Sequence, residues 1–167
     1  MSAVLRTPEI RVCPLKRLYQ LIASENTHRW AAIISSSSQP DIRKLGSTAY
    51  VFRRYDDIDM EIPGRSFSRE DADAFAGFLS AQAPKADVIY CCCDAGESRS
   101  PAVAAAVSRY FSVRDDHIWQ NPHYHPNMLV FDRLTTALGV PVSDEEKDLL
   151  IYLNRKAFTD AINRAKK

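Results

Sequence analysis

The 167-residue sequence has almost no excess of either charge, with 22 basic and 21 acidic side chains and a formal net charge of +1. A chain without a strong positive charge lacks a sequence-wide attraction for nucleic acid or anionic membranes, so neither is expected as a partner. Any affinity for an anion must therefore come from a local group of residues.

Long hydrophobic runs are also missing from the sequence. No segment is apolar over the roughly 20 residues that a membrane-spanning helix needs. Residues 1–8 do not combine a basic region with a hydrophobic one, as a secretory signal does. These absences predict a cytoplasmic protein without a membrane association.

Cysteine is scarce, and its placement does not suit a disulfide framework. Of the four cysteines, Cys91, Cys92 and Cys93 are consecutive and Cys13 is far away. Small secreted proteins depend on spaced pairs of cysteines, which this chain lacks. The four side chains are therefore expected to be thiols.

The composition that is present, 46% hydrophobic and 26% charged residues, is that of an ordinary globular protein, and the length suits a single domain over 1–167. Apolar runs that read as strands alternate with segments of helical spacing. The predicted strands are 10–13, 30–34, 50–55 and 88–92, and the predicted helices are 14–22, 68–82, 101–107, 128–138 and about 143–165. The serine-rich segment 35–40 is expected to be a loop without a chemical role. This alternation predicts a three-layer α/β domain with a central, mostly parallel sheet flanked by helices.

The most informative segment lies between the last predicted strand and an alanine-rich helix. It runs from Cys93 to Ser100, with the sequence Cys-Asp-Ala-Gly-Glu-Ser-Arg-Ser. In a strand, tight loop and helix, the loop amides and the helix N-terminus can bind the oxygens of a small anion, and Arg99 can clamp them. The same positive surroundings favour the thiolate of Cys93, which is the nucleophilic form.

This Cys-x-x-Gly-x-x-Arg-Ser segment resembles the signature of the cysteine-dependent protein tyrosine phosphatases, most closely the small dual-specificity type. By pattern the resemblance covers about 30–138, and it is motif-specific only at this loop. It implies hydrolysis of phosphate monoesters through a cysteinyl-phosphate intermediate, without a metal or another cofactor. The substrate would be a phosphorylated protein or a small phosphomonoester.

The resemblance also assigns roles to residues of this chain. Cys93 would be the nucleophile, Arg99 would bind the phosphate, and Ser100 would hydrogen-bond the sulfur and help it to leave. The remaining phosphate-binding positions would be those between nucleophile and arginine: Asp94, Ala95, Gly96, Glu97 and Ser98. Ser100 is also a candidate N-cap before Pro101.

The family's general acid is an aspartate on a separate loop some thirty residues before the cysteine. Three aspartates of this chain, Asp56, Asp57 and Asp59, lie in that window. Asp57 is the favoured acid, because it comes just after the predicted strand that ends at Tyr55. Asp59 and Asp56 are the alternates, and a solvated acidic turn is the structural alternative for any one of them.

Two departures from the family pattern keep other functions open. Cys92 stands where the family usually has histidine, and Glu97 places a carboxylate on the phosphate loop. A binding module for phosphate or phosphopeptide, with little or no turnover, is the first alternative. A sulfurtransferase or an arsenate reductase is the second, although the arsenate-reducing relatives of low-molecular-weight phosphatases carry the motif near the N-terminus.

Further residues carry weaker hypotheses. Cys91, Cys92 or Cys13 could trap an oxidised Cys93 as a disulfide, although packing in a buried strand is the favoured explanation for the first two. Asn127 is expected to cap the helix that follows it, with bracing of the phosphate loop as the alternative. Three histidines, His117, His123 and His125, do not have the spacing of a zinc site. Three arginines near the acidic loop could recognise a second phosphate or sit in solvent: Arg53, Arg54 and Arg65.

Overall fold

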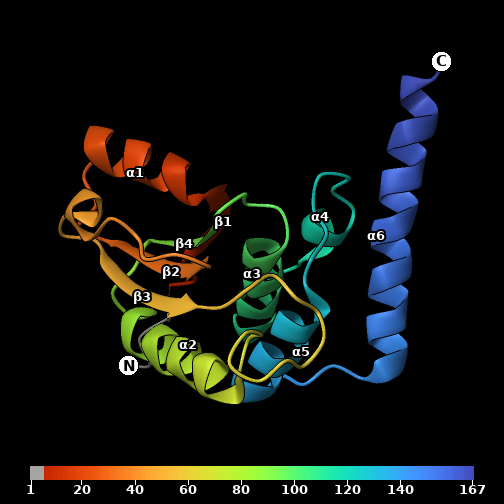
Figure 1. The fold of residues 1–167 in the computed structure, drawn as a ribbon. Helices are drawn as coiled ribbons and strands as arrows, with labels where there is room; N and C mark the ends of the chain where they lie inside the picture. The colour runs from red at the N-terminus through yellow and green to blue at the C-terminus, as the bar shows by residue number, and fades with distance from the viewer. Residues whose placement is uncertain (1–5) are drawn as a thin grey trace.

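The computed structural model describes residues 6–167, so residues 1–5 of the segment inspected for a secretory signal lie outside the described part. Within residues 6–167, the fold consists of four strands and seven helical segments (Figure 1). In chain order they are β1 (Glu9–Pro14), α1 (Leu15–Ser24), β2 (Trp30–Ser36), the 3-10 helix η1 (Ile42–Leu45), β3 (Ala49–Arg54), α2 (Arg69–Gln82), β4 (Val88–Cys93), α3 (Arg99–Tyr110), α4 (Asp116–Trp119), α5 (Met128–Ala137) and α6 (Asp144–Ala165).

The four strands form one sheet in the order β1-β4-β2-β3, and every pairing in it is parallel. Parallel strands end at the same edge of a sheet. The segments that follow the four strands therefore leave from one edge, α1 directly after β1 and loops after β2, β3 and β4, and this is the edge where open parallel sheets place their ligand sites. β4 lies between β1 and β2, so its carboxyl end is at the centre of that edge.

Helices cover both faces of the sheet, which gives the three layers expected from the sequence (Figure 1). On one face, Leu18 of α1 and Leu45 of η1 pack with Tyr90 and Cys92 of β4. On the other face, Ile89 and Cys91 of β4 pack with α2, α3 and α5. The prediction of an α/β fold with a central parallel sheet is confirmed.

Local signals place several helix ends as predicted. Ser68 and Asp71 form a complete capping box at the start of α2, and the Ser143 hydroxyl accepts the Glu146 N–H at the start of α6. α6 is tied to the body by Asn154, whose Nδ2 donates to the carbonyls of Trp119 at 3.1 Å and Tyr124 at 2.8 Å. The cap chemistry thus fixes where the helices begin.

The serine segment after β2 differs from its prediction. Ser35 and Ser36 were expected in a loop, but they are the last two residues of β2 and are fully buried. Their hydroxyls can be buried because each has a partner: Tyr55 Oη donates to Ser35 Oγ at 2.6 Å, and Ser36 Oγ donates to an Asp94 oxygen at 2.6 Å.

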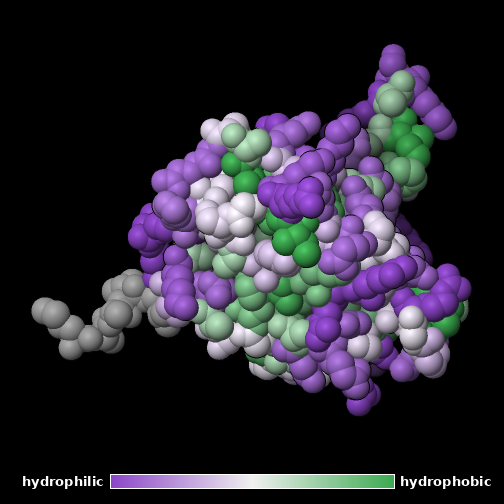
Figure 2. All heavy atoms as spheres, turned by 60° about the vertical axis from the view of Figure 1, so that its left-hand side comes forward, coloured by the Kyte–Doolittle hydropathy of each residue, from purple (hydrophilic) through white to green (hydrophobic). Residues whose placement is uncertain are grey.

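The surface is polar over most of the face drawn in Figure 2, with apolar side chains in a central area and on the projecting end of α6 at upper right. Phe158 and Ile162 of α6 are 44% and 39% exposed. None of the helices within residues 6–167 is both long and apolar enough to cross a lipid bilayer.

Candidate active site

The segment from Cys93 to Ser100, called the signature loop below, lies where the parallel strands end, at the centre of that edge of the sheet. It joins the end of β4 to the start of α3. Cys93 is the last residue of β4, and in the sheet it pairs with Pro14 of β1 and Ser35 of β2. Arg99 is the first residue of α3. The loop is therefore held by its own strand, by both neighbouring strands and by the helix that follows.

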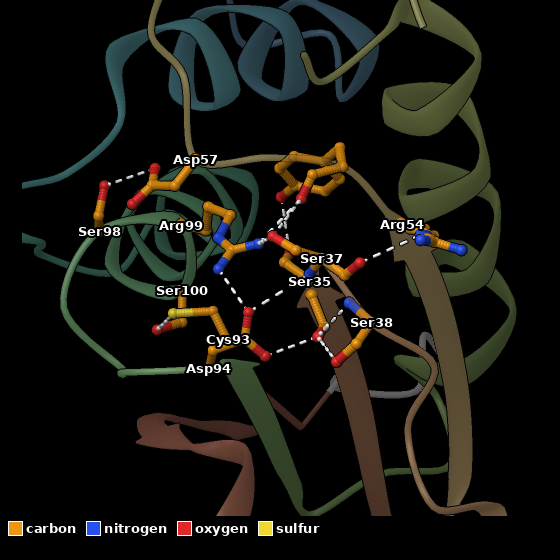
Figure 3. Close-up of polar contacts among 12 residues, drawn as sticks. Ser35, Ser37, Ser38, Arg54, Asp57, Cys93, Asp94, Ser98, Arg99 and Ser100 are labelled. Atoms are coloured by element: carbon orange, nitrogen blue, oxygen red, sulfur yellow. Dashed lines mark hydrogen bonds and ion pairs between the residues drawn. The ribbon is translucent and has the colours of Figure 1, made fainter. Parts of the chain in front are cut away.

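The Cys93 sulfur faces two hydrogen-bonding groups of this loop. Its Sγ is 3.2 Å from the Gly96 N–H and 3.0 Å from Ser100 Oγ, and the residue is 2% exposed (Figure 3). Ser98 occupies the N-cap position of α3, so the alternative prediction of Ser100 as the N-cap is wrong. Inside the first turn of α3, the Ser100 hydroxyl is turned toward the sulfur instead.

The Arg99 side chain is buried and held by three acceptors from three different segments. Nη1 donates to the Tyr55 carbonyl at 2.9 Å and to Ser37 Oγ at 3.2 Å, and Nη2 donates to Asp94 Oδ2 at 2.7 Å. Nε is buried and has no hydrogen-bond partner within residues 6–167. Nε and Nη2 share one edge of the planar guanidinium, the edge that can bind two oxygens of one anion.

Asp94 is the carboxylate that holds Arg99 in this orientation. Besides Arg99, it accepts hydrogen bonds from Ser36 Oγ at 2.6 Å and the Ser37 N–H at 3.3 Å. Partial burial acts to raise the pKa of Asp94, but the hydrogen bonds from Ser36, Arg99 and Ser37 outweigh it and the pKa lies below its ordinary value. Asp94 is thus a charged partner of the arginine.

Ser36 therefore contacts Asp94, and Ser37 contacts both Asp94 and Arg99. The expectation that the serine segment has no chemical role is wrong. Sequence inspection missed these two residues and Tyr55. The available signal was their position, because Ser36 ends β2 and Ser37 follows it, while Tyr55 follows β3, and both strands run parallel to β4 in the same sheet. Burial raises the pKa of Tyr55 far above its ordinary value, so its hydroxyl stays neutral while it donates to Ser35.

Asp57 is the one of the three candidate aspartates that contacts the signature loop. Its Oδ1 accepts from Ser98 Oγ at 2.9 Å and from Asn127 Nδ2 at 2.8 Å (Figure 3). Asp56 Oδ2 instead forms an ion pair with Arg65 Nε, at 2.9 Å. Asp59 lies in a groove beside α5 and α6. Oδ2 of Asp57 has no hydrogen bond within residues 6–167, and the residue is exposed.

Asn127 joins the acidic loop to the signature loop. Its Oδ1 accepts the Val130 N–H, which makes it the expected cap of α5, and its Nδ2 also donates to the Ile58 carbonyl at 3.1 Å. Its backbone N–H donates to the Ser98 carbonyl at 3.2 Å, and that of His125 donates to the Glu97 carbonyl at 2.8 Å. Asn127 therefore both caps α5 and braces the signature loop.

The remaining candidates lie at the rim or away from the site. Glu97 is exposed, and Arg54 Nε donates to the Ser37 carbonyl at 3.1 Å. Arg53 and Arg65 are ion-paired with Asp71 and Asp56. Within residues 6–167, no three histidine, cysteine or acidic side chains gather as metal ligands, and the His125 ring packs edge-on against Phe158.

Gly96 permits the backbone geometry of the loop, and its replacement gives a stability test. Its φ is +74°, and a Cβ would lie 2.7 Å from Pro14 N. Gly64 has a φ of +76° but no atom within 4 Å of such a Cβ. Both Gly→Ala variants carry about 1–3 kcal/mol of backbone strain. Gly96→Ala adds a clash with the backbone of β1, so its free energy of unfolding in urea is expected to fall further than that of Gly64→Ala. Equal losses would contradict this packing.

Comparison with known proteins gives a likeness of fold. No family model matches the sequence, and no curated protein matches it. A solved mouse structure, of a protein provisionally classed as a dual specificity phosphatase and bound to zinc tungstate, superposes with a TM-score of 0.56 at 16% identity, covering 83% of this chain and 90% of the mouse chain. Human DUSP28 matches over 97% of this chain and 99% of its own, with a TM-score of 0.43 and 15% identity. The superposition on the mouse structure shows that the chain has the fold of a dual specificity phosphatase, as the resemblance of its Cys93–Ser100 segment predicts.

Proposed function

We propose that this protein hydrolyses phosphate monoesters by two-step phosphoryl transfer, with Cys93 as the nucleophile. The proposal rests on the groups near the Cys93 sulfur that can bind an anion, which are Arg99 and the backbone amides of residues 94–98. We call these groups the anion cradle. Buried Arg99 is fixed by three acceptors at the start of the helix that follows the cysteine loop, and its Nε–H has no hydrogen-bond partner among residues 6–167. An arginine held in this way is prepared for a ligand with two negative oxygens.

In the first step, the Cys93 thiolate attacks phosphorus in line with the ester oxygen. The sulfur–phosphorus bond forms as the phosphorus–oxygen ester bond breaks, and the leaving oxygen takes the electron pair. Arg99 and the amides of residues 94–98 hold the equatorial oxygens. Because Arg99 is already held by Tyr55, Ser37 and Asp94, its guanidinium needs little reorganisation in the transition state.

Asp57 is the proposed general acid for the leaving oxygen. Ser98 and Asn127 both hold Oδ1, which orients the carboxyl group and leaves Oδ2 to carry the proton. In the second step, the same group as a carboxylate accepts a proton from water, which attacks phosphorus and releases the cysteine. The Ser100 hydroxyl, 3.0 Å from the sulfur, can donate to the departing thiolate.

Asp57→Asn is expected to lower kcat by about 10²-fold for aryl phosphates with basic leaving groups, which is the lower range for loss of a general acid. The loss should shrink as the leaving phenol becomes more acidic, because such phenolates leave without a proton. Asparagine keeps an oxygen for the Ser98 and Asn127 hydrogen bonds, so the loop is preserved. The measurement is kcat for a series of substituted phenyl phosphates under reducing conditions.

Asp56→Asn and Asp59→Asn are the matched controls, and neither should change the dependence on the leaving group. If Asp59→Asn or Asp56→Asn steepened that dependence while Asp57→Asn did not, the acid would be reassigned. The assay on the wild type, with vanadate as inhibitor and without added metal, tests the proposed activity itself.

A phosphate-binding module with little turnover is the second candidate function. It is favoured by the contact between Asp94 and Arg99, because a carboxylate beside the binding arginine competes with a phosphate dianion. It is also favoured by Cys92 in the position where the family usually has histidine. This function predicts binding of vanadate or phosphate by the wild type without hydrolysis of any aryl phosphate.

A further inference from the structure

The thiols of Cys13 and Cys92 form a buried pair beside the signature loop. Cys13 of β1 is the register partner of Cys92 of β4, and the two sulfurs are 3.5 Å apart. The residues are 9% and 0% exposed. Side chains alternate along a strand, so Cys92 points to the α1 face of the sheet whereas Cys91 packs on the α3 face. The thiol nearest to Cys92 across the sheet therefore belongs to Cys13, while Cys93 faces Ser100.

The two thiols differ in access and in acidity. Cys13 lines a cavity of about 430 Å³ together with Arg17, His117 and Tyr124, so a small molecule can reach it from that side. The hydrogen bond with Cys92 outweighs burial and lowers the pKa of Cys13, with help from the charge of Arg17. Burial raises the pKa of Cys92. Cys13 is thus the thiol that ionises first and Cys92 is the protonated neighbour behind it.

We propose that Cys13 and Cys92 are a peroxide-sensitive pair that closes to a disulfide without using Cys93. The Cys13 thiolate attacks a peroxide oxygen, the O–O bond breaks, and Cys13 becomes a sulfenic acid while hydroxide leaves. The Cys92 sulfur then attacks the Cys13 sulfur, and the S–O bond breaks with release of water. Two thiols lose two electrons to one hydrogen peroxide, which is reduced to water.

The pair is coupled to the signature loop through the end of β1. The backbone of Cys13 and Pro14 lies directly against Gly96, whose N–H donates to the Cys93 sulfur. Closing the disulfide draws the two sulfurs from 3.5 Å to about 2 Å, so the Cys13 and Cys92 side chains must turn toward each other at the strand ends beside the loop. Cys92 is also bonded directly to Cys93 in the chain. Oxidation is therefore expected to shift the Gly96 amide and the Cys93 sulfur. It should also lower the rate of phosphate ester hydrolysis, an expectation that rests on the proposed function.

The chemistry is tested by mass mapping, which does not depend on activity. Purified protein is treated with hydrogen peroxide, free thiols are blocked, and tryptic peptides are identified with and without a reductant. A linked pair of peptides 12–16 and 86–99 is expected, and it must disappear on reduction. It should persist in Cys93→Ser and Cys91→Ala and be lost in Cys92→Ala. Sulfinic acid on Cys93 without a linked peptide, or a link that survives in Cys92→Ala, would overturn the proposal.

The functional consequence is measured on the same samples with an aryl phosphate. At a dose of peroxide that leaves Cys93 unoxidised in the peptide map, the wild type should lose most of its activity and recover it with a reductant, while Cys13→Ala should keep its activity. A linked peptide with unchanged activity would overturn the coupling to the loop. If the reduced wild type has no activity, the proposed function fails while the linked peptide still decides the disulfide. The Cys13→Ala and Cys92→Ala variants replace a buried thiol by a smaller apolar group, and fragmentation of the linked wild-type peptide locates the bond without them.

Discussion

The Cys93→Ser variant is expected to lose aryl phosphatase activity by about 10⁴-fold or more, because a serine hydroxyl without a general base beside it is a poor nucleophile. The Sγ atom is the group that faces the Gly96 N–H, at 3.2 Å, and a hydroxyl of similar size can keep this contact. The loop should therefore remain folded. The measurement is kcat/KM for para-nitrophenyl phosphate with excess reductant and enzyme concentrations high enough to detect residual turnover.

Binding of inorganic phosphate is the control for this variant. Cys93→Ser should still bind phosphate, measured by calorimetry, since Arg99 and the loop amides are unchanged. Cys91→Ala replaces a neighbouring thiol on the same strand, packed against α3, and is expected to keep its activity. Hydrolysis by Cys93→Ser at a tenth of the wild-type rate or more would rule out the covalent route.

Arg99→Lys is expected to lower kcat/KM by about 10³ to 10⁵-fold, the range found when an arginine that stabilises phosphoryl transfer is removed. A lysine ammonium is a single charge and cannot bind Tyr55, Ser37, Asp94 and two phosphate oxygens in one plane. The variant also leaves Asp94 without its guanidinium partner. Weaker phosphate binding should accompany the loss of rate.

Arg54→Lys is the matched control, because Arg54 lies at the rim and donates from Nε to the Ser37 carbonyl (Figure 3). Lysine keeps a positive charge near the site, and Arg54 contacts the Ser37 carbonyl but neither Arg99 nor Cys93, so the loss of activity should stay within about tenfold, the factor that corresponds to 1.4 kcal/mol. If Arg99→Lys lost no more activity than Arg54→Lys, Arg99 would not be the phosphate-binding residue.

The signature loop and its flanking elements could be predicted from the sequence because the signals there are local. An apolar strand, a glycine that needs a positive φ and an alanine-rich helix are adjacent in the chain. The capping box at Ser68 and the cap at Asn127 are local in the same sense. The proximity of Asp57 to the loop was anticipated from the resemblance, while its catalytic role stays a prediction.

The groups that hold Arg99 could not be predicted because they depend on strand order. Ser37 and Tyr55 follow β2 and β3, and they meet Arg99 only because the sheet runs β1-β4-β2-β3. The pairing of Cys13 with Cys92 depends on register as well, since a slip by one residue would turn one thiol to the other face. The hydrophobic spacing within each strand does not determine which strands are neighbours or how their residues are aligned.

A search for the phosphorylated intermediate tests the central claim most directly. Ser100→Ala removes the hydroxyl that lies 3.0 Å from the sulfur, so release of the cysteine should slow more than its phosphorylation. Rapid acid quench of this variant with a labelled aryl phosphate, followed by peptide mapping, should find one phosphoryl group on Cys93 in peptide 86–99. Steady hydrolysis by the wild type, with no phosphate on any cysteine of either protein at any time point, would contradict the account.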